Sequence, residues 1–403
     1  MSKIKDFYFF LVVLYSGMAL AFFRSHEGLI ALWALGLFIF GRETLYPSRK
    51  LFIALGVWMG YFTINTLIIR SFHPMFMGIY IAKIMIAYWL LTNYKEQIFK
   101  KYEDTIYNLT IISLALYSIQ IIIPSQMWNI FQAIDLSEGI FPHKLYSSIG
   151  IYTFHQKNLS ELFPRNSGFT WEPGPFSCYV MLALFFNIAR NNIKIKDKKR
   201  LMVYITALIT TQSSTGFIVL LAIIIWISWA RFKNIAFKFL SVPIAISIVI
   251  YLFINLPWLQ EKIVNEAEQD VEEIMERATL TGSSYAPGRF ASFQMRWEDY
   301  KNYPIAGYGG KNSLQTGFIS EDHTVSAING IGTILGKYGS IGFTIFIWCI
   351  FSAGRWLGLY YKYTSHMIFP VLLLMIGFGF GIIESPIIVT LFLVSFFITH
   401  KNV

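Results

Sequence analysis

Residues 7–23, FYFFLVVLYSGMALAFF, form an apolar run of roughly 17 residues that follows two lysines, Lys3 and Lys5. A helix needs about 17–25 mostly apolar residues to cross the ~30 Å hydrocarbon core of a bilayer, so this run is long enough. No small-residue cleavage site follows it. We therefore interpret the run as an uncleaved first transmembrane helix and not as a signal peptide.

Similar runs recur along the whole chain. Apolar residues make up 55% of the 403 residues, charged residues 14%, and the mean hydropathy is +0.52. This composition predicts an all-α, polytopic membrane protein in which residues 1–403 form one integral membrane domain. We predict twelve spans, at residues 6–23, 28–40, 51–69, 76–92, 106–123, 175–189, 201–212, 214–230, 236–254, 325–353, 367–383 and 386–399. Two of these, 28–40 and 201–212, are short enough to be tilted, half-buried or re-entrant.

The positive charge is distributed by side of the membrane. The formal net charge is +10, but with the N-terminus inside, lysines and arginines favour the inner side by about two to one. The excess therefore indicates topology, with both termini in the cytoplasm, and not a nucleic-acid partner. The two cysteines, Cys178 and Cys349, both fall in apolar spans, which argues against a disulfide framework and against a thiolate metal site.

Two long loops, residues 124–174 and 255–324, fall on the outer side, and long ordered loops commonly carry function. The first begins with an amphipathic segment at 125–134. Its aromatic residues either stack on sugar rings or anchor the chain at the membrane interface; they are Trp128, Phe131, Tyr146, Tyr152 and Phe154. In the second loop, residues 258–278 have helical periodicity with an acidic outer face. That face has no histidine at ligand spacing, so we expect no metal there.

Charged residues at the end of the first loop provide the first candidate site. In RNSGFTWEPGP (165–175), Arg165 precedes a turn, and Glu172 precedes two prolines that open the next span. The first interpretation is structural: Arg165 and Glu172 form an ion pair, and Glu172 caps the next helix. The alternative is a site that binds an anionic substrate. A charged side chain within or near the membrane costs free energy, so such residues usually have a function.

The second loop adds three candidates. Arg289 and Arg296 are seven residues apart, so a helix would place them on one face, where two guanidinium groups suit a phosphate. They could equally pair with the acidic 266–276 helix. His323 precedes the next span and is a candidate general base. Two lysines within spans, Lys83 and Lys337, have less specific interpretations; Lys83 could pair with Glu384.

The ordered set of motifs resembles the O-antigen polymerases (Wzy type), which are related to the O-antigen ligases. The motifs are Arg165-x-x-Gly-x-x-x-Glu172-Pro, Gln212-Ser-Ser-Thr-Gly216, Gly288-Arg289, Pro304-x-x-Gly-Tyr-Gly309, His323, and the glycine-rich stretch from Asn329 to Gly342. Each motif is short, and the specificity comes from their order and from the two-loop plan. The resemblance covers roughly residues 120–345.

The resemblance implies a GT-C-like fold in the bacterial inner membrane and a glycosyltransferase active site facing the periplasm. Its substrates would be oligosaccharide repeat units on undecaprenyl diphosphate, used without a metal, nucleotide sugar or other cofactor. Arg165, Arg289 and Arg296 would bind the diphosphate, and Glu172 or His323 would activate the acceptor hydroxyl. Membrane lipid and a polysaccharide chain-length regulator are further candidate partners.

Three functions stay open at this point. The Arg165…Glu172-Pro pattern favours a polymerase, whereas a ligase would transfer polymer to lipid A-core. The rival from another class is a flippase of lipid-linked oligosaccharides, although flippases tend to place charge in a central cavity. The sequence does not indicate the sugars, the linkage, the stereochemical outcome, the oligomeric state, or which candidate is the base.

Overall fold

The chain was analysed as a computed structural model that describes residues 2–137, 146–156, 163–231, 268–281, 287–319, 325–363 and 365–398, together with positions 240, 243, 247 and 264. This part of the chain is mostly helical, as predicted, with one antiparallel pair of short strands. The first half contains α1 (Ser2–Ser16), α2 (Ala21–Arg24), α3 (His26–Ile39), α4 (Gly41–Leu45), α5 (Arg49–Ile69), α6 (Pro74–Tyr94), η1 (Lys95–Gln97), α7 (Ile98–Ile122), α8 (Pro124–Ala133), β1 (Tyr146–Ser148), β2 (Thr153–His155) and α9 (Pro173–Arg190).

The second half contains α10 (Lys198–Thr211), α11 (Ser214–Arg231), α14 (Val271–Thr281), α15 (Arg289–Asn302), η2 (Asn312–Leu314), α16 (Gly330–Tyr361), α17 (Ile368–Gly379), η3 (Gly381–Glu384), α18 (Pro386–Phe392) and α19 (Val394–Phe397). Most of the span predicted at 236–254 lies outside the described residues. The last predicted span is divided in the structure into two short helices, α18 and α19.

Four helical stretches of the described chain are long and apolar enough to cross a membrane: 49–69, 74–122, 214–231 and 330–361. The helices α3 and α17 are apolar but shorter, with 14 and 12 residues. A multi-pass membrane protein is therefore shown, while the count of twelve spans stays a prediction. The stretch 74–122 comprises two predicted spans, because α6 and α7 are joined only by the short η1.

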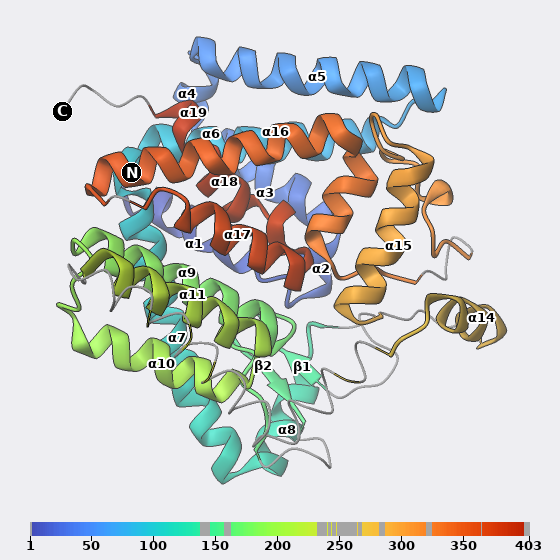
Figure 1. Ribbon diagram of the computed structural model, residues 1–403. Coiled ribbons are helices and arrows are strands. Elements are labelled where there is room, and N and C mark those ends of the chain that lie inside the picture. The colour runs from blue at the N-terminus through green and yellow to red at the C-terminus, as the bar shows by residue number, and fades with distance from the viewer. Residues whose placement is uncertain are drawn as a thin grey trace.

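The helices share two ends (Figure 1). One end, called here the terminal end, carries both termini: Lys5 pairs with Glu43 at 2.8 Å, and the Lys50 amine donates to the Phe397 carbonyl at 3.3 Å. The other end, called here the loop end, carries α2, α8, the two strands, α14 and α15. The first and last described helices, α1 and α19, thus both reach the terminal end.

A buried carboxylate ties the terminal end together. Glu103 of α7 is fully buried and accepts hydrogen bonds from Asn187, Arg190 and Arg200, each at 2.6 Å. A buried charge is tolerated only when it is paired and hydrogen-bonded, and this one has both kinds of partner. Glu103 therefore fixes the start of α7, the end of α9 and the start of α10 relative to each other.

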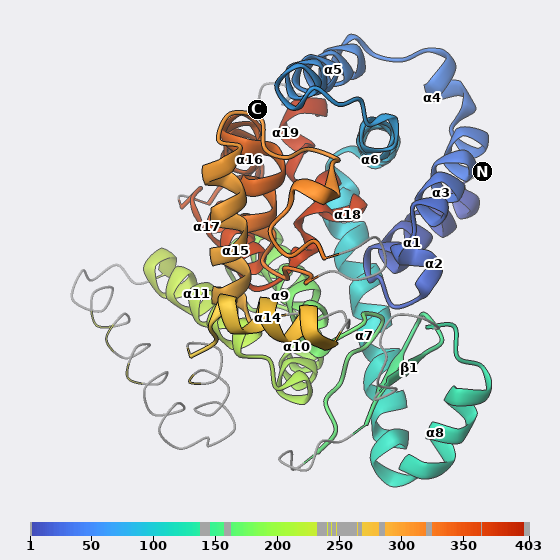
Figure 2. The ribbon, with the colours of Figure 1, turned by 90° about the vertical axis from the view of Figure 1, so that its right-hand side faces the viewer.

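Helix α9 is the centre of the bundle, between α7, α10 and α11 (Figures 1 and 2). Every residue from Pro173 to Ala189 is buried. A helix that is apolar on all sides must be surrounded by other elements or by lipid, and here other helices surround it. The segment Glu172–Pro175 is therefore held at the loop end by a helix that is buried along almost its whole length.

Helix α16 is interrupted at Gly339, whose φ of 61° and ψ of −164° are accessible to glycine but not to other residues at low cost. The turn 304–309 fills this kink. The Tyr308 amide donates to Gly336 O at 3.1 Å, and the Gly309 amide donates to Lys337 O at 2.9 Å. Two glycine-rich motifs that are distant in sequence therefore form one structural unit.

Candidate functional site

The segment that begins with Arg165 docks on the turn between α10 and α11. The Asn166 amide donates to Thr210 O at 2.9 Å, and the Arg165 guanidinium donates to the carbonyls of Thr211 and Gln212 at 3.2 and 3.4 Å. These carbonyls end α10, where the helix dipole favours a cation. The first two motifs of the sequence thus meet directly at the loop end.

Of the two local roles considered for Glu172, the structure shows only the helix-cap position. Among the residues that the structure describes, no ion pair joins Arg165 to Glu172, because the Arg165 guanidinium is directed to α10. Glu172 occupies the N-cap position of α9 with extended backbone, but its side chain makes no capping hydrogen bond. The ion-pair alternative is therefore wrong, and Glu172 caps α9 by its position but without a side-chain hydrogen bond.

The cation near Glu172 is Arg24, which the sequence did not single out. Its guanidinium lies over the ring of Trp171, 5.5 Å from the centroid, and its Nε donates to Met18 O at 2.7 Å. Burial lowers the pKa of Arg24 to about 10, and the fields of Tyr146 and Glu172 offset part of that effect. Arg24 comes from the α1–α3 connection, which pairs with the first loop through the Met18–Thr170 bridge.

Arg289 approaches the same helix terminus from the other large loop. It is the first residue of α15, and its guanidinium lies 5.1 Å from the ring centroid of Phe380. That ring packs against Gly174, where an added Cβ would be 1.9 Å from the ring. The Asn329 amide fixes this arrangement by donating to the carbonyls of Arg289 and Phe378, at 3.4 and 3.0 Å.

The N-terminus of α9 is therefore flanked by two cations from separate parts of the chain. Arg24 is placed by its contact with Trp171, and Arg289 by its contact with Phe380, the ring that packs on Gly174. The amide dipoles of α9 add a partial positive charge at this point. Together these groups form an environment that favours an anion, with one carboxylate, that of Glu172, beside it.

Arg296 has a different environment from Arg289, although both belong to α15. It is 5% exposed, pairs with Asp299 at 2.6 Å, and lies 5.7 Å from the ring centroid of Tyr308. The other oxygen of Asp299 accepts the Thr316 amide. This pairing fits a structural role that fixes α15 to the 308–316 turn, and binding of diphosphate by Arg296 stays a prediction.

His323 lies outside the described residues, so its place relative to Glu172 is not described. Among the residues that are described, no cluster of three or more His, Cys, Asp or Glu side chains could hold a metal ion. Cys178 and Cys349 are both buried, and neither forms a disulfide bond. The described part of the site contains arginines, the carboxylate of Glu172 and the N-terminus of α9.

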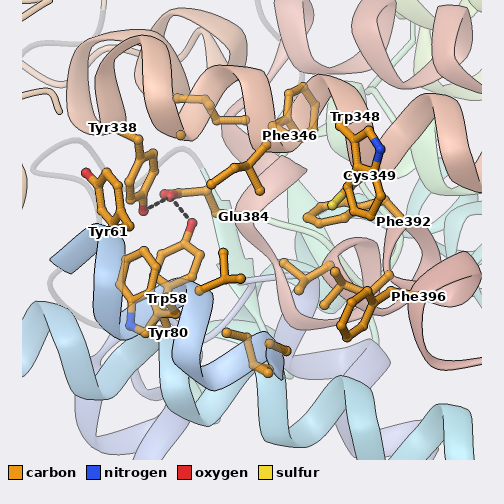
Figure 3. A pocket seen from close by; sticks show the side chains of 18 of the residues that line it. Trp58, Tyr61, Tyr80, Tyr338, Phe346, Trp348, Cys349, Glu384, Phe392 and Phe396 are labelled. Atoms are coloured by element: carbon orange, nitrogen blue, oxygen red, sulfur yellow. Dashed lines mark hydrogen bonds between the residues drawn. The ribbon is translucent and has the colours of Figure 1, made fainter. Parts of the chain in front are cut away.

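A second polar cluster borders an apolar cavity of about 190 Å³ between α5, α6, α16 and α18 (Figure 3). Glu384 accepts hydrogen bonds from the hydroxyls of Tyr80 and Tyr338 and pairs with Lys337 at 3.2 Å. The partner of Glu384 is thus Lys337, while the Lys83 amine lies 4.7 Å from the ring centroid of Tyr80. The rest of the cavity wall is aromatic and aliphatic, down to Phe396.

The central part of the chain has a recognisable family signature. Residues 201–347 match the family model described as O-antigen ligase. Over this region the chain is similar to the O-antigen ligase family. No curated protein and no solved structure matches the chain. The family comprises membrane glycosyltransferase-like ligases and polymerases, so the chain is a multi-pass membrane protein with an O-antigen-related function.

The O-antigen ligase region includes the 212–216 turn, Arg289, Arg296 and the 304–309 turn, whereas Arg165 and Glu172 precede it. The structure nevertheless joins the two parts, since Arg165 binds the α10–α11 turn of the matched region. The resemblance drawn from the motifs is confirmed for the matched region.

Proposed function

We propose that this chain is an O-antigen, or surface polysaccharide, polymerase. It joins oligosaccharide repeat units carried on undecaprenyl diphosphate, at the periplasmic face of the bacterial inner membrane and with a GT-C-type fold. The observation that carries this proposal is the convergence of Arg24, Glu172 and Arg289 on the N-terminus of α9. Those residues come from three separate stretches, and all of them lie at the loop end.

The transfer step needs few groups. A hydroxyl oxygen of the acceptor unit attacks the anomeric carbon of the donor sugar and forms the new glycosidic bond. The bond between that carbon and the diphosphate oxygen breaks, and the diphosphate leaves with the electron pair. The hydroxyl proton passes to a base, for which Glu172 and His323 are the candidates.

The cations stabilise the leaving group. As the anomeric C–O bond breaks, negative charge develops on the diphosphate, and guanidinium groups neutralise it with paired hydrogen bonds. Arg289 is the best-placed residue for this role because its guanidinium rests on Phe380, beside the first turn of α9. In the same proposal Arg165 holds the first loop on α10, and it binds diphosphate from that position.

The apolar cavity beside Glu384 suits the lipid part of such a substrate. Beyond the kink it extends along α16 from Gly342 to Cys349, which is about 10 Å at 1.5 Å per residue, and Trp348 on its wall is 58% exposed. A polyprenyl chain entering from the bilayer could lie along this wall. Its diphosphate would then remain at the loop end.

A ligase is the second candidate function, because the matching family model is described as O-antigen ligase. The two activities share the donor and differ in the acceptor. A ligase would add polymer to lipid A-core, whereas a polymerase adds it to another lipid-linked unit. Loss of the gene therefore leaves single repeats on the core in the polymerase case, and no repeats on it in the ligase case.

The proposal is tested in cells that lack the native gene and receive a plasmid-borne variant. Wild-type chain should restore a ladder of polymer lengths, and Arg289→Ala should leave single repeats at unchanged protein level. Lys301→Ala is the matched control, because Lys301 is on the same helix but is 52% exposed and pairs with the partly exposed Glu298. Wild-type ladders from Arg289→Ala would contradict the assignment.

A further inference from the structure

A second cavity at the loop end is larger than the apolar one and has a different lining. Its volume is about 480 Å³, within the ~300–1,000 Å³ range of small-molecule sites. It is bounded by the end of α7, the start of α8, strand β2 and the residues just before Arg165. We call it the α8 pocket, lined by Gln120, Ile121, Pro124, Ser125, Trp128, Asn129, Phe154, His155, Gln156, Phe163 and Pro164.

The floor of the α8 pocket is rigid. Gln120 is 1% exposed, and its amide donates to His155 O at 2.7 Å while its oxygen accepts the Tyr152 hydroxyl at 2.5 Å. The Tyr117 hydroxyl donates to Pro164 O at 2.7 Å. These hydrogen bonds fix β2 and the 163–164 segment to α7, so the pocket is preformed.

Its accessible side chains combine apolar groups, among them Ile121 and Phe163 (43% and 56% exposed), with an indole ring and neutral polar groups. Trp128 is half-buried, and its ring packs on Phe154 with the centroids 5.3 Å apart. Ser125 and Asn129, four residues apart on α8, share one face of that helix and are exposed, and Gln156 is half-buried opposite them. None of the described lining residues is Lys, Arg, Asp or Glu.

The interface-anchor interpretation does not account for Trp128. The exposed apolar residues at this side of α8 are Ile130 and the C-cap residue Ile134, which are 57% and 53% exposed. Trp128 precedes Ile130 by two residues, which is about 200° around the helix, so it belongs to another face. Membrane contact is therefore left to the isoleucines, and the indole faces the pocket.

This combination identifies a ligand class. A pyranose has a C–H face that packs on an aromatic ring and a rim of neutral hydroxyls that pair with amide and hydroxyl side chains. A diphosphate would require cations, which are absent from the described lining but present next to it, at Arg165. We infer that the α8 pocket binds a neutral sugar of the oligosaccharide repeat unit. This inference rests on the proposed function, since it supplies the saccharide part of that substrate.

The test measures saccharide binding and transfer separately. The binding probe is the free repeat-unit oligosaccharide released from the strain's own lipid-linked intermediate, titrated against full-length protein in detergent. Trp128→Ala should weaken binding at least tenfold and raise KM for the lipid-linked acceptor with kcat nearly unchanged. Ile130→Ala, on the other face of α8, should behave as wild type.

A filling variant guards against a folding defect in Trp128→Ala. Asn129→Trp adds bulk at the exposed mouth of the pocket and removes no buried group, so it should produce the same tenfold loss. Unchanged oligosaccharide binding in both variants overturns the inference even if polymerisation is confirmed. Weakened binding in a chain that makes no polymer supports the pocket while rejecting the polymerase assignment.

Discussion

Gly174 packs so closely on Phe380 that one added methyl group should displace the ring on which Arg289 rests. An ideal Cβ at Gly174 would be 1.9 Å from the ring Cζ and 2.6 Å from Cε1. Phe380 is 4% exposed and has no solvent to move into. Overpacking of this kind costs about 1–3 kcal/mol. If this strain is relieved by shifting Arg289 from the leaving group, transfer should slow about 5- to 150-fold.

Helix propensity alone predicts the opposite effect of Gly174→Ala on stability. Alanine is more favourable than glycine within a helix by about 1 kcal/mol, so Gly174→Ala would be neutral or stabilising without the contact. Gly78→Ala is the matched control, because an added Cβ there meets nothing within 4 Å. The assay is the initial rate of polymer formation in membranes, normalised to folded protein.

A double-mutant cycle isolates the contact. Phe380→Leu makes room for the methyl group but removes the ring beneath Arg289, a contact worth about 0.5–2 kcal/mol. Gly174→Ala combined with Phe380→Leu should therefore be no slower than Phe380→Leu alone. The reasoning is refuted if Gly174→Ala has the wild-type rate, or if the double variant shows the product of both single losses.

Three further predictions concern the elements that hold the site. Arg165→Ala should abolish polymer, because the first loop loses its bonds to the end of α10; wild-type chain lengths on a gel of surface polysaccharide would count against this. Arg200→Ala should lower stability by about 1.5–3 kcal/mol, seen as a lower melting temperature in detergent, because fully buried Glu103 loses a charged partner. Burial raises the pKa of Asp135, but hydrogen bonds from Ser137 and Ser148 outweigh this effect, so the net pKa is lowered. The charged carboxylate therefore stabilises the folded state above about pH 4, and this stabilisation is lost as the pH falls through the pKa of the folded state. Asp135→Asn should accordingly melt earlier than wild type at pH 7, with the difference shrinking as the pH falls through the lowered pKa of Asp135; a constant difference would contradict this origin.

The sequence predicted the features that depend on long apolar runs and on motif order. The helical membrane class, the amphipathic segment before 134 and the kinship with the O-antigen ligase family follow from such patterns, and the structure or the family comparison confirms them. Helix divisions such as that between α18 and α19 were not predicted, because hydropathy does not indicate where a buried helix breaks.

The partners of charged residues were harder to predict than their positions. Glu172 and Arg165 are seven residues apart, so an ion pair was reasonable, but the chain turns at Gly168 with φ of 51° and directs Arg165 toward α10. Arg24 was missed because a single arginine between two spans resembles an ordinary loop charge. Only the pairing of Met18 with Thr170 brings it to Trp171, and that is a long-range contact without a local signal.

The Arg296 prediction shows a related limit. Helical spacing correctly placed Arg289 and Arg296 on one helix, α15. The spacing does not show that the Arg296 guanidinium forms an ion pair with Asp299, which lies one helical turn further along α15. Arg296→Ala should therefore reduce stability as well as activity, whereas Arg289→Ala should reduce activity alone, and melting temperatures with transfer rates separate the two.

Polymerisation by purified protein is the most direct measurement of the central claim. Wild-type chain in liposomes would receive undecaprenyl-diphosphate-linked repeat units and no metal or nucleotide sugar, with Arg289→Ala and Lys301→Ala tested in parallel. The polymerase assignment predicts a ladder of lipid-linked products from wild type and Lys301→Ala, and single units from Arg289→Ala. Movement of units across the bilayer without a ladder, or a product only when lipid A-core is supplied, would contradict it.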